Sequence, residues 1–172
     1  MKHTLVALLR DQPGVLSRAV SLFRRRNFNI ESLTVGQTEA PGISRMTLVV
    51  DGDTTSVEQV IKQLYKLIDV LKVSDVSNDP AVARELMLAK VYAPTAKRGE
   101  LMQLADVFGA KVVDVVPDAM MLELSGSPDK VDSFLELLKP FGIREMVRTG
   151  RVAMVRGAVA TTVASHPERL AA

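Results

Sequence analysis

The sequence contains no cysteine and no tryptophan, and only two of its 172 residues are histidine. The absence of cysteine excludes disulfides, thiolate chemistry and zinc sites with cysteine ligands, and it fits a reducing compartment. No apolar run approaches the ~18 to 20 residues that a membrane span needs, and the first residues lack the cleavage site of a secretory signal. We therefore expect a cytoplasmic protein without a membrane segment.

Patterns of catalytic and metal-binding residues are also missing. His3 begins a strand-like run and His166 lies near the C-terminus, so neither is placed to act as a general base or a metal ligand. The sequence has no GxGxxG motif and no phosphate-binding loop. We expect a protein that is not an enzyme, with no catalytic residues, no metal site and no cofactor bound by this chain.

What is present is the composition of a globular protein, with 47% hydrophobic and 24% charged residues. The first half has strand-like runs and amphipathic helices in the order βαββαβ, which is the order of the ferredoxin-like architecture. The strand-like runs cover residues 3–9, 28–37, 43–50 and 70–76, and the helices cover about 15–27 and 57–68.

The second half repeats this order. Its strand-like runs cover residues 86–93, 112–116, 120–124 and 143–147, with helices after a turn at 94–99 and over 128–138. We predict an α+β fold with two tandem ferredoxin-like βαββαβ domains. The first covers residues 1–77 and the second 85–157, with a linker at 78–84 and a frayed tail at 158–172.

The stretch RDQPGVLS predicts a helix N-terminus that could hold an anion. Pro13 and Gly14 fall where backbone N–H groups have no partner within the helix, and glycine lets a ligand approach closely. The structural alternative is that Asp11 caps the helix and Pro-Gly only makes the turn.

Asn29 is a polar residue within an apolar strand, and it needs a hydrogen-bonding partner. In a ferredoxin-like sheet this second strand lies at the edge, and NIESLTV carries no proline, lysine or bulge signal to prevent pairing with another chain. A homodimer paired through this edge would bring Asn29 of one chain near the Gly14 turn of the other. Such a site suits a free amino acid, with its carboxylate at the helix N-terminus and its ammonium at Asn29.

The stretch LLRDQPGVLSRAVSLFRRRNFNIESLTVGQTEAPGISRMTLVV contains PGVLSR, NIESLTV and SRMT in that order. It resembles the N-terminal ACT domain of acetolactate synthase (acetohydroxyacid synthase) regulatory subunits. KQLYKLIDVLKVSDV and EMVRTGRVAMVRG extend the resemblance to about Gly157. It implies a small subunit that dimerises through ACT sheets, binds a thiamine-diphosphate-dependent large subunit, raises its activity and makes it sensitive to branched-chain amino acids, chiefly valine. Thiamine diphosphate, Mg and FAD are then expected in the large subunit.

The resemblance also implies where valine binds. Its predicted contacts are Asp11, Gly14, Val15, Leu16, Asn29 and Ile30. Family members often have Asn where this chain has Asp11, which would place a carboxylate near that of the ligand.

Two other functions remain open. One is a free-standing amino-acid sensor with a different partner. The other is an RNA-recognition motif, which shares the βαββαβ order but stacks bases on aromatic residues of its central strands. HTLVALL and ISRMTLVV contain no aromatic residue and the net charge is only +2, so we expect no nucleic acid partner.

Overall fold

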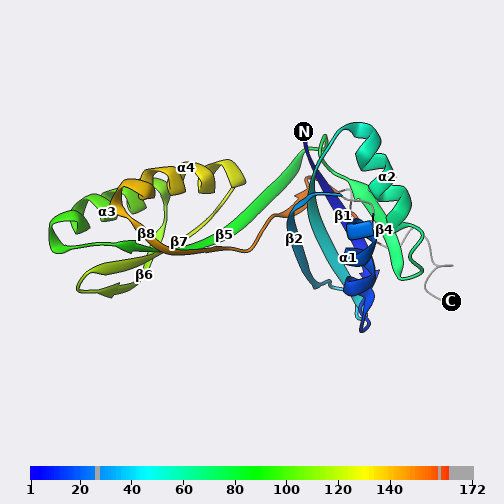
Figure 1. Cartoon of the computed structure of the whole chain (residues 1–172), viewed down its shortest axis with the longest axis horizontal. Helices are drawn as coiled ribbons and strands as arrows, with labels where there is room; N and C mark the ends of the chain where they lie inside the picture. Colours follow the sequence, from blue (N-terminus) through cyan, green and yellow to red (C-terminus); the bar gives the residue numbers. More distant parts are fainter. Residues whose placement is uncertain (26–27, 159, 163–172) are drawn as a thin grey trace. The chain divides into compact units, whose positions relative to one another are not determined.

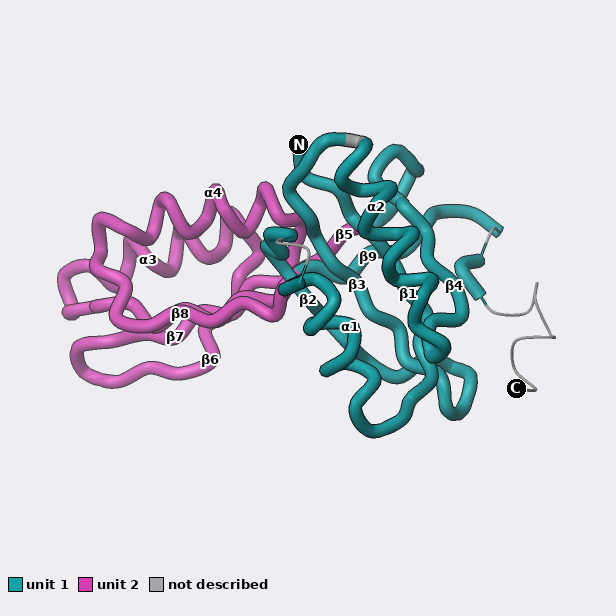
Figure 2. The backbone as a smooth tube through the Cα atoms, turned by 45° about the vertical axis from the view of Figure 1, so that its right-hand side comes forward, with its two compact units in different colours: residues 1–82, 151–172 teal, residues 83–150 magenta. Residues whose placement is uncertain are grey.

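The computed structural model describes residues 1–25, 28–158 and 160–162, and the chain divides into two compact units (Figure 2). Unit 1 comprises residues 1–82 and 151–172, and unit 2 comprises residues 83–150. Within the described ranges, no helix is long and apolar enough to cross a membrane.

Unit 1 has the predicted βαββαβ order, with antiparallel strands arranged β2-β3-β1-β4. Strand β2 therefore lies at an edge of the sheet, as predicted. The elements are β1 (Lys2–Arg10), α1 (Val15–Arg25), β2 (Ile30–Gln37), β3 (Ile43–Asp51), α2 (Thr54–Leu64) and β4 (Val70–Asp75), followed after unit 2 by β9 (Val152–Val155).

The core of unit 1 lies between the sheet and its two helices (Figure 1). Because alternate side chains of a strand point to opposite faces, Leu5, Ala7 and Leu9 of β1 all face the helices and are buried. Phe23 of α1 and Leu64 of α2 pack against them. Helix α2 begins at Thr54, three residues before the predicted start, because the Asp53 side chain caps it by accepting a hydrogen bond from Ser56 N at 2.8 Å.

Unit 2 repeats the architecture, with strands in the order β6-β7-β5-β8 and both helices on one face. Its elements are β5 (Ala81–Tyr92), α3 (Thr95–Phe108), β6 (Lys111–Val116), β7 (Ala119–Gly126), α4 (Pro128–Leu138), the 3-10 turn η1 (Lys139–Phe141) and β8 (Ile143–Arg148). The predicted tandem ferredoxin-like fold is thus confirmed. The predicted turn at residues 94–99 was wrong, because α3 already begins at Thr95.

The division of the chain differs from the predicted boundaries at two places. Part of the predicted linker, from Ala81 onward, belongs to the continuous strand β5. Residues 151–157, which we assigned to the second domain, belong to unit 1. They do so because Ala153 is buried beside Val6 and Val76 on the face of the sheet away from the helices.

Part of the predicted frayed tail lies outside the described residues. Positions 159 and 163–172, including His166, are in this category. Of the described remainder, Thr162 O accepts a hydrogen bond from Lys72 Nζ at 3.4 Å.

Candidate functional site

The Gly14 turn joins β1 to α1. Gly14 has a φ of 84°, a left-handed conformation that favours glycine, and a Cβ there would lie 3.3 Å from Arg18 Nη1. Val15 N donates a long hydrogen bond of 3.3 Å to Gln12 O. The Val15 side chain is buried in the core, whereas Leu16 is 42% exposed. The side chain of Leu16 is therefore accessible to a ligand, whereas Val15 as a whole residue is only 4% exposed.

Asp11 ties this turn to the C-terminal end of β2. Its carboxylate accepts a hydrogen bond from Gln37 Nε2 at 3.4 Å, and its backbone N donates to Gly42 O at 2.8 Å. Arg18 is a neighbour that sequence reasoning missed. Its position one helical turn after Gly14 was a usable signal, because side chains at i and i+4 lie on one face.

Asn29 and Ile30 lie at the opposite end of β2, where the strand begins at Ile30, so Asn29 precedes the strand and is not within it as predicted. Asn29 is exposed, and Ile30 is partly buried against the core. Ile30 pairs with Val50 and Gln37 pairs with Ser44 of the same β3 strand. Since a strand advances about 3.3 Å per residue, roughly 23 Å separates the two ends. One chain alone therefore does not bring the six predicted residues together.

The edge strand contains a bulge that the sequence analysis did not predict. The register of β2 against β3 shifts between Ile30 and Ser32, so Glu31 is the extra residue. The Glu31 carboxylate accepts a hydrogen bond from Lys2 Nζ at 2.5 Å. The expectation of a strand without a bulge was therefore wrong.

The surface around β2 is partly apolar. Val35 of β2 is 40% exposed, and Val20 of α1 is exposed like Leu16 one turn before it. At 100° per residue, these two α1 side chains lie on the side away from α2. An edge strand flanked by exposed apolar side chains is suited to pairing with another chain.

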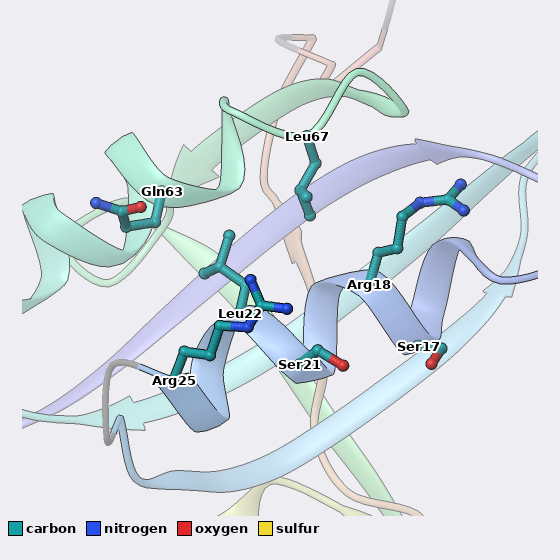
Figure 3. Close-up of a pocket in the computed structure, with 7 residues that line it drawn as sticks. All are labelled: Ser17, Arg18, Ser21, Leu22, Arg25, Gln63 and Leu67. Atoms are coloured by element: carbon teal, nitrogen blue, oxygen red, sulfur yellow. The ribbon is translucent and has the colours of Figure 1, made fainter.

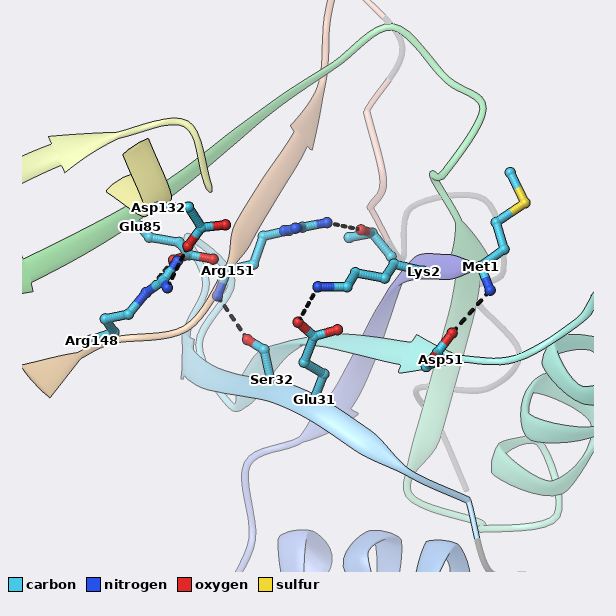
Figure 4. A network of polar contacts seen from close by, with 10 residues as sticks. Met1, Lys2, Glu31, Ser32, Asp51, Glu85, Asp132, Arg148 and Arg151 are labelled. Carbon is cyan, nitrogen blue, oxygen red and sulfur yellow. Dashed lines mark hydrogen bonds and ion pairs between the residues drawn. The ribbon is translucent and has the colours of Figure 1, made fainter. Parts of the chain in front are cut away.

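The segment that returns from unit 2 also contacts β2. Arg151 N donates to Ser32 Oγ at 2.8 Å, and Arg151 Nη1 donates to Thr4 Oγ1 at 3.1 Å (Figure 4). Arg45 Nη2 donates to Ala153 O at 2.7 Å. Burial lowers the pKa of Arg45, although the negative charge of Glu39 opposes this. Residues from both ends of unit 1 therefore hold the outer face of its sheet.

A separate ion-pair cluster lies in unit 2, where Arg148 binds Glu85 and also Asp132, the latter at 2.7 Å (Figure 4). Burial disfavours the charged guanidinium, but the hydrogen bonds to the two carboxylates outweigh it and raise the pKa of Arg148. This cluster links β5, α4 and β8. Because it connects three elements of one unit, we interpret it as a contact that stabilises the fold.

Helices α1 and α2 of unit 1 enclose a groove of about 400 Å³ (Figure 3). Arg18 crosses toward the segment after α2, where its Nη2 lies 2.5 Å from Asp69 Oδ2. The groove is lined by Ser17, Arg18, Ser21, Leu22, Arg25, Gln63 and Leu67. The sequence analysis did not predict it.

No group of three or more His, Asp or Glu side chains that could hold a metal ion occurs in the part of the chain that the structure describes. His3 is buried, and its Nδ1 lies 3.5 Å from Asp75 Oδ2.

Comparison with known proteins covers nearly the whole chain. Residues 5–72 match the sequence model of the "AHAS small subunit-like ACT domain", and residues 84–157 match that of the "Small subunit of acetolactate synthase". The chain is 55% identical over 157 residues to a probable acetolactate synthase small subunit of Archaeoglobus fulgidus, covering 91% of this chain and 98% of that one. It is 51% identical to the acetolactate synthase small subunit of Aquifex aeolicus, covering 90% and 81%.

A solved structure agrees with these matches. The crystal structure of the acetolactate synthase small subunit from Thermotoga maritima superposes with a TM-score of 0.85 at 39% identity, covering 92% of this chain and 99% of that one.

Proposed function

Because the chain belongs to the family of acetolactate synthase small subunits, we propose that it is a non-catalytic regulatory subunit that acts in the cytoplasm. It binds the large catalytic subunit, raises its activity and makes it sensitive to inhibition by valine or another branched-chain amino acid. Thiamine diphosphate, Mg and FAD belong to the large subunit. The observation that carries this proposal is that both halves of one short chain match the small subunit, without a further domain between them.

The position of β2 supports a homodimer. In an antiparallel pair of β2 strands related by a two-fold axis, the start of one strand lies beside the end of the other. Asn29 of one chain then lies near Gln37 of its neighbour. Because Asp11 connects Gln37 to the Gly14 turn, this pairing also brings that turn close to Asn29. The roughly 23 Å that separates the two halves of the site within one chain is thereby removed.

The residues gathered in this way suit the parts of valine. The carboxylate would take the backbone N–H groups around Gly14 and Val15, where it competes only with the long bond to Gln12 O. The ammonium would take the amide oxygen of Asn29, and Leu16 offers apolar contact to the aliphatic side chain. Arg18 lies beside Gly14 but is paired with Asp69, so the negative charge of Asp11 stays close to that of the valine carboxylate.

Valine bound between two chains can change the large subunit only as far as it prefers one arrangement of the dimer over another. Couplings of this kind are typically ~1 to 3 kcal/mol, or roughly 5- to 150-fold in affinity. A free-standing sensor would bind the same ligand without the large subunit, so binding to that subunit separates the two functions.

The dimer is tested by a charged residue at the edge. Val35→Lys should weaken the dimer, because lysine on an edge strand disfavours pairing. The matched control is Val113→Lys, which adds the same charge to exposed strand β6 of unit 2. Sedimentation of the parent as a monomer, or of both variants as equally stable dimers, would contradict pairing through β2.

The ligand site is tested by Asn29→Ala and Gly14→Asp in the large-subunit rate assay. Losing a hydrogen bond to a charged group costs ~1.5 to 3 kcal/mol, so Asn29→Ala should raise the inhibitory valine concentration at least ~10-fold. Gly14→Asp should abolish inhibition by placing a carboxylate where that of valine binds. Both variants should still activate the large subunit. The control is Asn78→Ala, which changes another exposed asparagine and should behave like the parent.

Two outcomes would contradict this site. If both variants keep the parent inhibition curve, valine binds elsewhere. If they lose activation while remaining folded and dimeric, ligand sensing and activation share one surface.

A further inference from the structure

The groove between α1 and α2 has an unusual set of polar groups. Every polar side chain that lines it can donate a hydrogen bond: two serine hydroxyls, two guanidinium groups and the Gln63 amide (Figure 3). No acidic side chain is among its lining residues. Asp69, which is not among the lining residues, binds Arg18.

Arg25 is the cation available for a partner. It is exposed, and it makes no hydrogen bond or ion pair with any residue that the structure describes. Helix α1 has no acidic residue over Val15–Arg25, and two of its three arginines, Arg18 and Arg25, line the groove. The groove is therefore positively charged along the side formed by α1.

The groove also has an apolar part. Leu22 and Leu67 are partly buried between the two helices, and Ile68 beside Leu67 is 79% exposed. Arg18 and Arg25 are seven residues apart on one helix, which corresponds to about 10 Å along its axis. This length fits a short peptide segment better than a single small anion.

We propose that this groove is the docking surface for an acidic segment of the catalytic large subunit, so the inference rests on the proposed function. A carboxylate of that segment binds Arg25 and the hydroxyl of Ser21, the segment continues along α1 past Ser17, and a neighbouring aliphatic side chain packs on Leu22 and Leu67. Arginine is suited to this role, because its planar guanidinium binds a carboxylate through two parallel hydrogen bonds. The surface lies on the helices, away from the edge of β2, so docking leaves the proposed dimer intact.

The test is a titration of the large subunit with the whole chain, read as the concentration that gives half-maximal activation. Arg25→Glu reverses the charge in the groove and should raise this concentration at least ~10-fold, with Arg25→Gln between it and the parent. Arg24→Glu is the matched control, since Arg24 is exposed on the same helical turn but does not line the groove. It should change the value less than ~2-fold, as expected for a charge at the rim.

Further readouts separate docking from other effects. Arg25→Glu and Arg24→Glu should unfold at the same temperature, and valine should still inhibit Arg25→Glu fully at saturating small subunit. The difference between Arg25→Glu and the parent should shrink at high salt, because exposed charges are screened.

Equal losses in Arg24→Glu and Arg25→Glu would overturn the groove as a specific site, since only the overall charge would then matter. If the parent activates normally and Arg25→Glu gives the same concentration for half-maximal activation, the groove is not the docking surface. The proposed function would remain intact. A parent that does not bind the large subunit would overturn both proposals.

Discussion

The two units share one architecture but treat the outer faces of their sheets differently. In unit 1, Val6 of the central strand is buried under Ala153 from the returning segment. In unit 2, Leu86 of the central strand and Val147 beside it remain exposed. The same βαββαβ order therefore gives one sheet that is covered on both faces and one that is covered on one face only. Part of the stability of unit 1 comes from residues that follow unit 2 in the sequence.

The largest expected effect comes from placing a charge on the two outer faces. Ala153→Asp should destabilise the protein by ~3 kcal/mol or more, because the carboxylate would be buried beside Val6 without a partner. Val147→Asp should change stability by less than ~0.5 kcal/mol, since Val147 is 58% exposed. Denaturant unfolding of both variants measures the difference, and equal losses would mean that the outer faces are equivalent.

A smaller effect is expected where the returning segment contacts β2. Ser32→Ala removes the acceptor of Arg151 N and should cost ~1 kcal/mol, because a partly buried hydrogen bond is lost. Ser133→Ala on exposed α4 loses only a bond to the carbonyl one turn before it and should stay within ~0.5 kcal/mol. Unfolding midpoints of the two alanine variants provide the comparison, and a Ser133→Ala loss as large as that of Ser32→Ala would contradict it.

Two glycines should respond to alanine with opposite signs. Gly14→Ala in unit 1 should destabilise by ~1 to 2 kcal/mol, because its φ of 84° is unfavourable for a side chain. Gly99→Ala in unit 2 should stabilise by up to ~1 kcal/mol, since Gly99 lies inside α3 and a Cβ there meets no atom within 4 Å. Thermal unfolding distinguishes the two, and a stabilised Gly14→Ala would show that the turn does not require glycine.

The smallest effect concerns pH. A hydrogen bond from Arg144 lowers the pKa of Asp118 in unit 2, and hydrogen bonds from Ser56 lower that of Asp53 in unit 1. A lowered pKa gives stability that is present above the ordinary carboxyl pKa and is lost as the pH falls through the folded-state value. Asp118→Asn should therefore be slightly less stable than the parent at neutral pH and equal to it in acid. Asp53→Asn should differ less, because asparagine also caps helices. The free energy of unfolding of Asp118→Asn and the parent should be measured from neutral to acid pH. A difference between the two proteins that did not change with pH would contradict the account.

Local signals explain which parts of the fold were predictable. Helix α4 was predicted at its observed bounds, because Ser127 caps it and Pro128 suits its first position. Strand β9 and the true extent of β5 were missed. Ala153 of β9 contacts Val6 and Val76, and Arg156 N donates to Pro80 O just before β5. These contacts join residues that are distant in sequence and leave no periodic pattern.

The candidate site was predictable only in part, for a similar reason. The Gly14 turn and the edge position of β2 follow from local patterns and from the topology. The position of Arg18 beside Gly14, the Glu31 bulge and the groove lined by Arg25 depend on side-chain placement. The distance between Asn29 and Gly14 within one chain was not predictable either. It follows from the pairing of β2 with β3, which only the structure shows.

The central claim is most directly tested by measuring acetolactate formation by the large subunit while the chain is added, with and without valine. The account predicts no acetolactate from the chain alone, a rise in the large-subunit rate as the chain is added, and a fall of that raised rate when valine is present. A large-subunit rate that does not respond to the chain, or acetolactate formed by the pure chain itself, would contradict a regulatory subunit.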